Sequence, residues 1–175
     1  MAYAINLRCD NNTAEQLEHL WDRCSQLEEA PSMRAMGNPP HLTFAVYDEL
    51  DQHILDAGFE SALDSLTAMT IRFGSIGYFQ APHALILWAA PDLPPQISKA
   101  HTNIHATIDE SLCRRNYRMG VWVPHCSLAT TVPRSRMSDV LALVTAPFDP
   151  VEVVFDVMDY ASFPPVEVIR EVRLV

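Results

Sequence analysis

The chain has 175 residues, 49% of them hydrophobic and 19% charged, a balance that fits one globular domain over residues 1–175. Its formal net charge of −10, with only 12 Lys and Arg residues, argues against binding of long nucleic acid and leaves a small phosphorylated ligand. Four scattered cysteines, no signal-peptide pattern and no long apolar span predict a cytoplasmic protein without a disulfide framework, metal-ligand spacing or membrane segment. A monomer without a metal or cofactor is expected.

The predicted elements alternate between strands and helices. The first half should contain strands at 2–8 and 41–47 and helices at 9–27 and 48–67, with Asn12 and Glu15 resembling a capping box. The second half should contain strands at 69–79, 83–90 and 122–132, and two final strands at 151–160 and 166–175. Its helices should be one that begins at 91–95 and a short one that spans 134–146. In the helix that opens at 91–95, a buried stripe is expected at Ile97, Ile104, Ile108 and Leu112.

This order contains a repeat that residue identity hides. Strand, helix and a strand that begins at a histidine occur from Tyr3 to His41, and again over a nearly equal interval from Leu85 to His125. No linker or low-complexity segment separates the halves. The sequence therefore predicts two lobes of one α+β domain, with a groove between two small antiparallel sheets and the helices outside.

The repeat carries the same short motif twice. PHLTF places His41 and Thr43 in one strand, and PHCSL places His125 and Ser127 in the other. Residues two apart in a strand share a face, so each motif should present an imidazole and a hydroxyl together. Such a set suits a phosphate ester, because hydroxyls donate to its oxygens, one imidazole accepts a proton and the other gives one.

The paired motifs resemble those of the two-histidine (2H) phosphoesterase superfamily, and most closely its 2′-5′ RNA ligase and cyclic phosphodiesterase branch. The resemblance covers nearly the whole chain and implies a duplicated, bilobal fold. It also implies metal-independent opening of 2′,3′-cyclic phosphates of nucleotides or RNA ends, usually to 2′-phosphates. His41 would then protonate the leaving oxygen and His125 would activate water, or the reverse, while Thr43 and Ser127 would hold the phosphate.

The chain departs from that pattern at one point. Many relatives of the RNA-ligase type carry a basic residue shortly after the second motif, whereas this chain has Thr130, and its next cation is Arg134. That difference and the acidic charge favour small cyclic phosphates over RNA ends. Alternatives are a phosphodiesterase or ligase acting on 2′-5′ linkages, a binding module for cyclic phosphates without catalysis, and an α+β protein whose His–hydroxyl pairs are incidental.

Further side chains are candidates by position alone. A base or sugar could stack on Trp122, Tyr117 or Tyr78, and a phosphate could meet Arg34, Arg115 or Arg118; each aromatic residue could equally be core. His101, His105 and Asp109 recur on one face of the helix that opens at 91–95. Two His at that spacing can bind a metal, but no general-base Glu or obvious further ligand accompanies them, so a polar helix face is expected.

Overall fold

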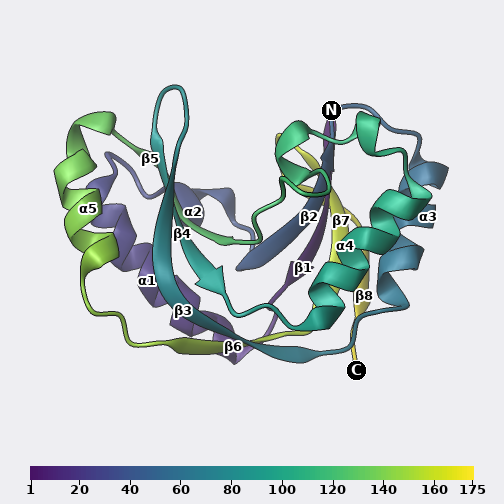
Figure 1. The fold of residues 1–175 in the computed structure, drawn as a ribbon, viewed down its shortest axis with the longest axis horizontal. Coiled ribbons are helices and arrows are strands. Elements are labelled where there is room, and N and C mark those ends of the chain that lie inside the picture. The colour runs from purple at the N-terminus through teal and green to yellow at the C-terminus, as the bar shows by residue number, and fades with distance from the viewer.

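The computed structural model describes residues 1–175 as a mixed fold of eight strands and five α-helices (Figure 1). The strands are β1 (Ala2–Arg8), β2 (His41–Tyr47), β3 (Met69–Gln80), β4 (Leu85–Pro91), β5 (Cys126–Val132), β6 (Val151–Phe155), β7 (Val157–Phe163) and β8 (Glu167–Arg173). The helices are α1 (Glu15–Cys24), α2 (Ser32–Met36), α3 (Gln52–Leu63), α4 (Pro95–Thr107) and α5 (Met137–Thr145). No helix is both long and apolar enough to cross a membrane.

The predicted α+β, two-lobed architecture is confirmed. The strand order is β6-β3-β4-β5-β2-β1-β7-β8, with antiparallel neighbours throughout. Two four-stranded halves meet where Leu42 of β2 pairs with Cys126 of β5, so the two predicted sheets join into one. Figure 1 shows the halves side by side, with α1 and α5 outside one and α3 and α4 outside the other.

Each repeat sends its helix across to the opposite half. Helix α1 follows β1 in the chain but packs on β5 and β6, whereas α4 follows β4 but packs on β2. Helix α3 lies on β7, and α5 lies on β3. This exchange ties the halves together, because neither half is covered by helices from its own repeat alone.

The two central strands share an irregularity. Between Ile5 and Asn6 of β1 the register with β2 shifts, which leaves Phe44 as an extra residue in β2. The register between β4 and β5 shifts in the same way, which leaves Leu128 as an extra residue in β5. Each extra residue directly follows the hydroxyl residue of its motif. Such bulges re-aim the side chains that come after them.

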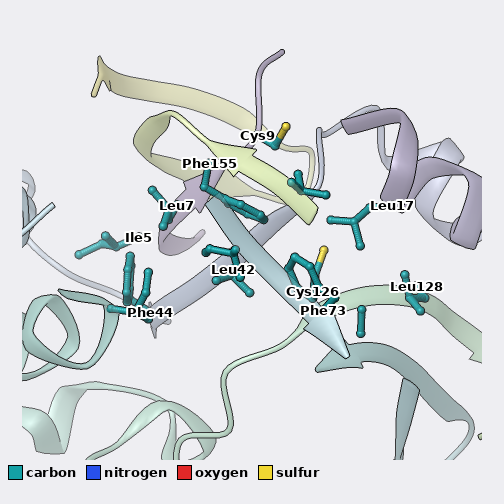
Figure 2. Packing of buried hydrophobic residues seen from close by; sticks show 14 of the residues in the cluster. Ile5, Leu7, Cys9, Leu17, Leu42, Phe44, Phe73, Cys126, Leu128 and Phe155 are labelled. Atoms are coloured by element: carbon teal, nitrogen blue, oxygen red, sulfur yellow. The ribbon is translucent and has the colours of Figure 1, made fainter. Parts of the chain in front are cut away.

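One core of 38 buried residues runs through both halves (Figure 2). Leu42 and Cys126 point into it beside Leu7, Phe73 and Phe155. Because successive residues of a strand alternate between faces, the neighbouring His41 and His125 should lie on the other face of the sheet. Burial of this apolar surface from both halves is the main force that holds the strand junction closed.

Two details differ from the predicted elements. The run at 151–160 is two strands that separate at Asp156, whose N–H donates to the Arg8 carbonyl while its carboxylate accepts from the Asp10 N–H. Strand β6 therefore joins β3, and β7 joins β1 at the other end of the sheet. Leu112 is exposed rather than part of a buried stripe, because α4 ends at Thr107.

Candidate active site

The two His–hydroxyl motifs lie side by side at the junction of β2 and β5. Leu42 of β2 pairs antiparallel with Cys126 of β5. The residues on either side of this pair are therefore opposite each other as well, His41 with Ser127 and Thr43 with His125. Leu42 and Cys126 are buried in the core, which turns the four polar side chains to the other face. The structure thus brings together the imidazoles and hydroxyls that the sequence placed 84 residues apart in the chain.

Both imidazoles are held in the same tautomer. The Nδ1–H of His41 donates to the carbonyl of Pro39 at 2.8 Å, and that of His125 donates to the carbonyl of Val123 at 2.7 Å. In each case the acceptor lies two residues earlier, across the proline of the motif. A carbonyl accepts but cannot donate, so Nε2 is the nitrogen left free for proton transfer in both rings.

A buried polar chain supports the first motif. The Thr43 hydroxyl donates to Asn6 Oδ1 at 2.8 Å, and Asn6 Nδ2 donates to Asp159 Oδ1 at 2.9 Å. The Asp159 carboxylate, 1% exposed, also lies 2.7 Å from Arg8 Nε. Burial raises the pKa of Asp159, and the Asn6 hydrogen bond with the charges of Arg8 and His41 opposes that rise. This chain places a carboxylate on the His41 side of the junction.

Aromatic rings surround the second motif instead. Phe79 meets the His125 ring edge-on at 5.0 Å between centroids, and Trp88 stacks on Phe79 at 4.9 Å. Burial lowers the pKa of His125, and the nearby His41 charge lowers it further. The surroundings of His125 thus favour its neutral form.

Two tryptophans bind the backbone of the two hydroxyl residues. The indole N–H of Trp122 donates to the Thr43 carbonyl at 3.0 Å, and that of Trp21 donates to the Ser127 carbonyl at 3.0 Å. Neither bond was foreseen from the sequence, because each joins residues far apart in the chain. Together they fix both strands from outside the β2–β5 pair.

A pocket of about 540 Å³ opens beside His125. It is lined by Phe79, Gln80, Ala81, Pro82, Ile86, Asn116, Tyr117, Val121, Trp122, Val123, His125, Ser127 and Thr130. A second hollow of about 470 Å³ lies near the N-terminus, around Tyr3 and Ile54, and contains no histidine. The pocket at His125 is therefore the binding-site candidate.

The residues suggested for substrate contact divide in two. Trp122 and Tyr117 line the pocket. Tyr78 does not: it neighbours Phe79 in β3, and successive strand residues point to opposite faces, so Phe79 is the side chain that reaches His125. Arg34 does not line the pocket either, because its guanidinium binds Glu18 and Asp22 of α1.

Of the three residues of the expected polar face on α4, His101 is buried, and Asp109 lies beyond the end of the helix at Thr107. The His101 side chain is 4% exposed and stacks on Trp122, with 4.0 Å between ring centroids and 9° between planes. The Nε2–H groups of His101 and His105 both donate to the Tyr117 carbonyl, at 2.8 and 2.9 Å. The pair thus supports the wall that Tyr117 and Trp122 give the pocket. No group of three or more His, Cys, Asp or Glu side chains is arranged to hold a metal ion.

Comparison with known proteins adds a family and a set of similar folds. The family model of the 2′-5′ RNA ligase superfamily matches residues 12–160. Escherichia coli LigT complexed with 3′-AMP has a TM-score of 0.65 at 14% identity, covering 98% of this chain and 97% of its own. TT0787 of Thermus thermophilus has a TM-score of 0.62 at 14% identity, with coverages of 99% and 98%. Usb1 of Kluyveromyces marxianus has a TM-score of 0.52 at 10% identity, with coverages of 99% and 98%. No curated protein sequence matches the chain.

Proposed function

Because the chain belongs to the 2′-5′ RNA ligase superfamily, we propose that it is a phosphodiesterase that opens 2′,3′-cyclic phosphates of nucleotides or RNA ends to 2′-phosphates. Membership makes phosphodiesterase or ligase chemistry the class of function, and the cyclic substrate is the finer proposal. One observation carries it: both imidazoles face the same side of the strand junction, each with Nδ1 bound to a carbonyl and Nε2 free.

In the proposed reaction, a water oxygen attacks phosphorus and the bond from phosphorus to O3′ breaks. One neutral imidazole takes the proton of the water at Nε2, and the other, protonated, gives its Nε2 proton to O3′. The product is a 2′-phosphate and a free 3′-hydroxyl. The two imidazoles supply both proton transfers, so we expect no requirement for a divalent metal ion.

The surroundings of the histidines support a division of roles. The chain from Thr43 through Asn6 to Asp159 places a carboxylate on the His41 side of the junction, which favours His41 as the proton donor to O3′. His125 has a pKa lowered by burial and by the His41 charge, which favours it as the base that activates water. The midpoint of the acidic limb of the pH–rate profile should therefore lie at a lower pH than the ordinary pKa of an imidazole.

The two hydroxyls start from different states. Ser127 lies opposite Trp88 in the neighbouring strand, and its hydroxyl has no hydrogen-bond partner within the protein, so it is free to donate to a phosphate oxygen. Thr43 already donates its only proton to Asn6 and must turn away from Asn6 to do the same. We therefore expect Ser127→Ala to weaken substrate binding more than Thr43→Ala.

Nucleotide-sized ligands fit this proposal. LigT of E. coli has been crystallised with 3′-AMP, ATP and NADP⁺, and the pocket beside His125 has a volume of about 540 Å³, within the range of small-molecule sites. Trp122 and Tyr117 offer ring surfaces to a base. A small nucleotide or oligonucleotide cyclic phosphate is the proposed ligand.

The test is phosphorus NMR of 2′,3′-cyclic AMP incubated with the protein in excess EDTA. We expect conversion to 2′-AMP by the wild type, and loss of nearly all conversion in His41→Ala and His125→Ala without loss of the fold. The matched control is His53→Gln, an exposed histidine on α3, which should keep full activity. Full activity in either site variant would refute the mechanism.

The same samples separate the alternatives. Turnover of 2′,5′-linked dinucleotides without turnover of the cyclic nucleotide would point to an enzyme for 2′-5′ linkages. Binding of the cyclic nucleotide without any product would point to a binding module.

A further inference from the structure

The pocket beside His125 contains no fixed charge. None of its 13 lining residues is Asp, Glu, Lys or Arg, although the chain has 12 Lys and Arg and 22 Asp and Glu residues. Much of the wall is apolar: Val121 and Val123 leave 50% and 44% of their surface exposed. Apolar side chains held open to water around a hollow are typical of a binding site for an uncharged group.

No arginine lines the pocket. Arg115 and Arg118 adjoin its lining residues Asn116 and Tyr117, but neither lines it, and Arg118 donates to the carbonyls of Cys113 and Ser111. Arg8, opposite His41 in the neighbouring strand β1, is paired with the buried Asp159. Arg34 is paired with carboxylates of α1. Arg134 is exposed and reaches the carbonyl of Pro82 at the rim, at 3.4 Å, where solvent screens its charge. The positive charge available to a bound phosphate is therefore that of a protonated imidazole.

We propose that this pocket selects ligands by charge: it takes a phosphodiester with a single negative charge on an uncharged organic group, and binds phosphomonoester dianions weakly. This inference rests on the proposed function. A cyclic phosphate is a monoanion at all pH values near neutrality, and one imidazolium can balance it. The 2′-phosphate product becomes a dianion above about pH 6, and its second charge has no partner in the pocket. The product is therefore released without inhibiting the enzyme.

Thr130 is the position where a cation would change this selection. Simple alternation along β5 would place Ala129, not Thr130, on the face of Ser127. The bulge at Leu128 shifts the alternation by one, so Ala129 is buried and Thr130 lines the pocket. Its backbone N–H is held by Glu28 and Ser32, so the residue is fixed at the wall of the pocket that it lines.

The test compares Thr130→Arg with the neutral control Thr130→Gln, after both are shown by circular dichroism to melt like the wild type. For each protein, the inhibition constant of 2′-AMP is divided by the Michaelis constant for 2′,3′-cyclic AMP at pH 5.5 and pH 7.5. The division removes any change in the histidines that affects both ligands alike. If 2′,3′-cyclic AMP is not turned over, dissociation constants of the two nucleotides from calorimetry replace the inhibition constant and the Michaelis constant.

In the wild type and Thr130→Gln the ratio should rise about tenfold or more between pH 5.5 and pH 7.5, as 2′-AMP gains its second charge. In Thr130→Arg the ratio at pH 7.5 should fall by about tenfold or more. A wild-type ratio below one at pH 7.5, or equal ratios in the Arg and Gln variants, would overturn charge selection. Absence of turnover with the expected ratios of dissociation constants would refute the proposed reaction and leave charge selection standing. Absence of binding by both nucleotides would overturn both.

Discussion

Lowering the pH from 7 to 5 should cost the protein stability through one buried side chain, His101. Burial lowers the pKa of His101 from 6.5 to about 4, and the nearby His105 charge acts in the same direction. The folded protein therefore keeps His101 neutral at both pH values. In the unfolded chain the same imidazole takes up a proton as the pH falls through 6.5, so acid favours the unfolded state.

The size of the effect follows from the two pKa values. One pKa unit corresponds to about 1.4 kcal/mol. With a folded pKa of about 4 and an unfolded value of 6.5, the free energy of unfolding should fall by about 2 kcal/mol between pH 7 and pH 5 through His101 alone. The loss begins near pH 6.5 and is complete below about pH 4.

The assay is urea unfolding followed by far-ultraviolet circular dichroism at pH 7 and pH 5. In His101→Gln the side-chain amide can still donate to the Tyr117 carbonyl but does not titrate, so this variant should lose about 2 kcal/mol less than the wild type over that range. The control His53→Gln removes an exposed histidine and should behave as the wild type does. Equal pH dependence in the wild type and His101→Gln would refute the reasoning.

Two further changes test how β3 and β5 are held. A Cβ at Gly77 would lie 2.4 Å from the Trp88 ring, so Gly77→Ala should destabilise the protein by about 1–3 kcal/mol and lower turnover by displacing the ring stacked beside His125. In thermal melts the control Gly74→Ala, in the same strand, should behave nearly as the wild type does. Similar losses in both variants would contradict this reasoning. The Glu28 carboxylate accepts hydrogen bonds from the start of α2 and the end of β5, so Glu28→Gln should cost about 1–3 kcal/mol in urea unfolding; an equal loss in the exposed Glu29→Gln would count against it.

The features that the sequence predicted well are those encoded locally. Strand β2 spans the predicted residues, His41 to Tyr47, and residues two apart in a strand share a face. The same rule placed His41 with Thr43 and His125 with Ser127. The duplication was also visible, since the order of strand, helix and His-strand survives where residue identity does not.

Several parts of the candidate site depend on pairing between distant strands. Phe79, not Tyr78, reaches His125, because the face of β3 that meets the pocket is set by its pairing with β4. Asn6 and Asp159 reach Thr43 because β1 lies between β2 and β7. The single signal in the sequence was a polar residue inside each of two apolar strands.

The sequence by itself determined the α+β class, the two-lobed repeat and the faces of the two His–hydroxyl motifs, because these follow from periodicity over a few residues. Only the tertiary structure decided that the motifs meet at one strand junction, that a bulge turns Thr130 into the pocket, and that His101 is buried against Trp122. Those features depend on register and on packing between segments far apart in the chain. A shift of one residue in such pairing leaves the local pattern unchanged and moves every side chain to the other face.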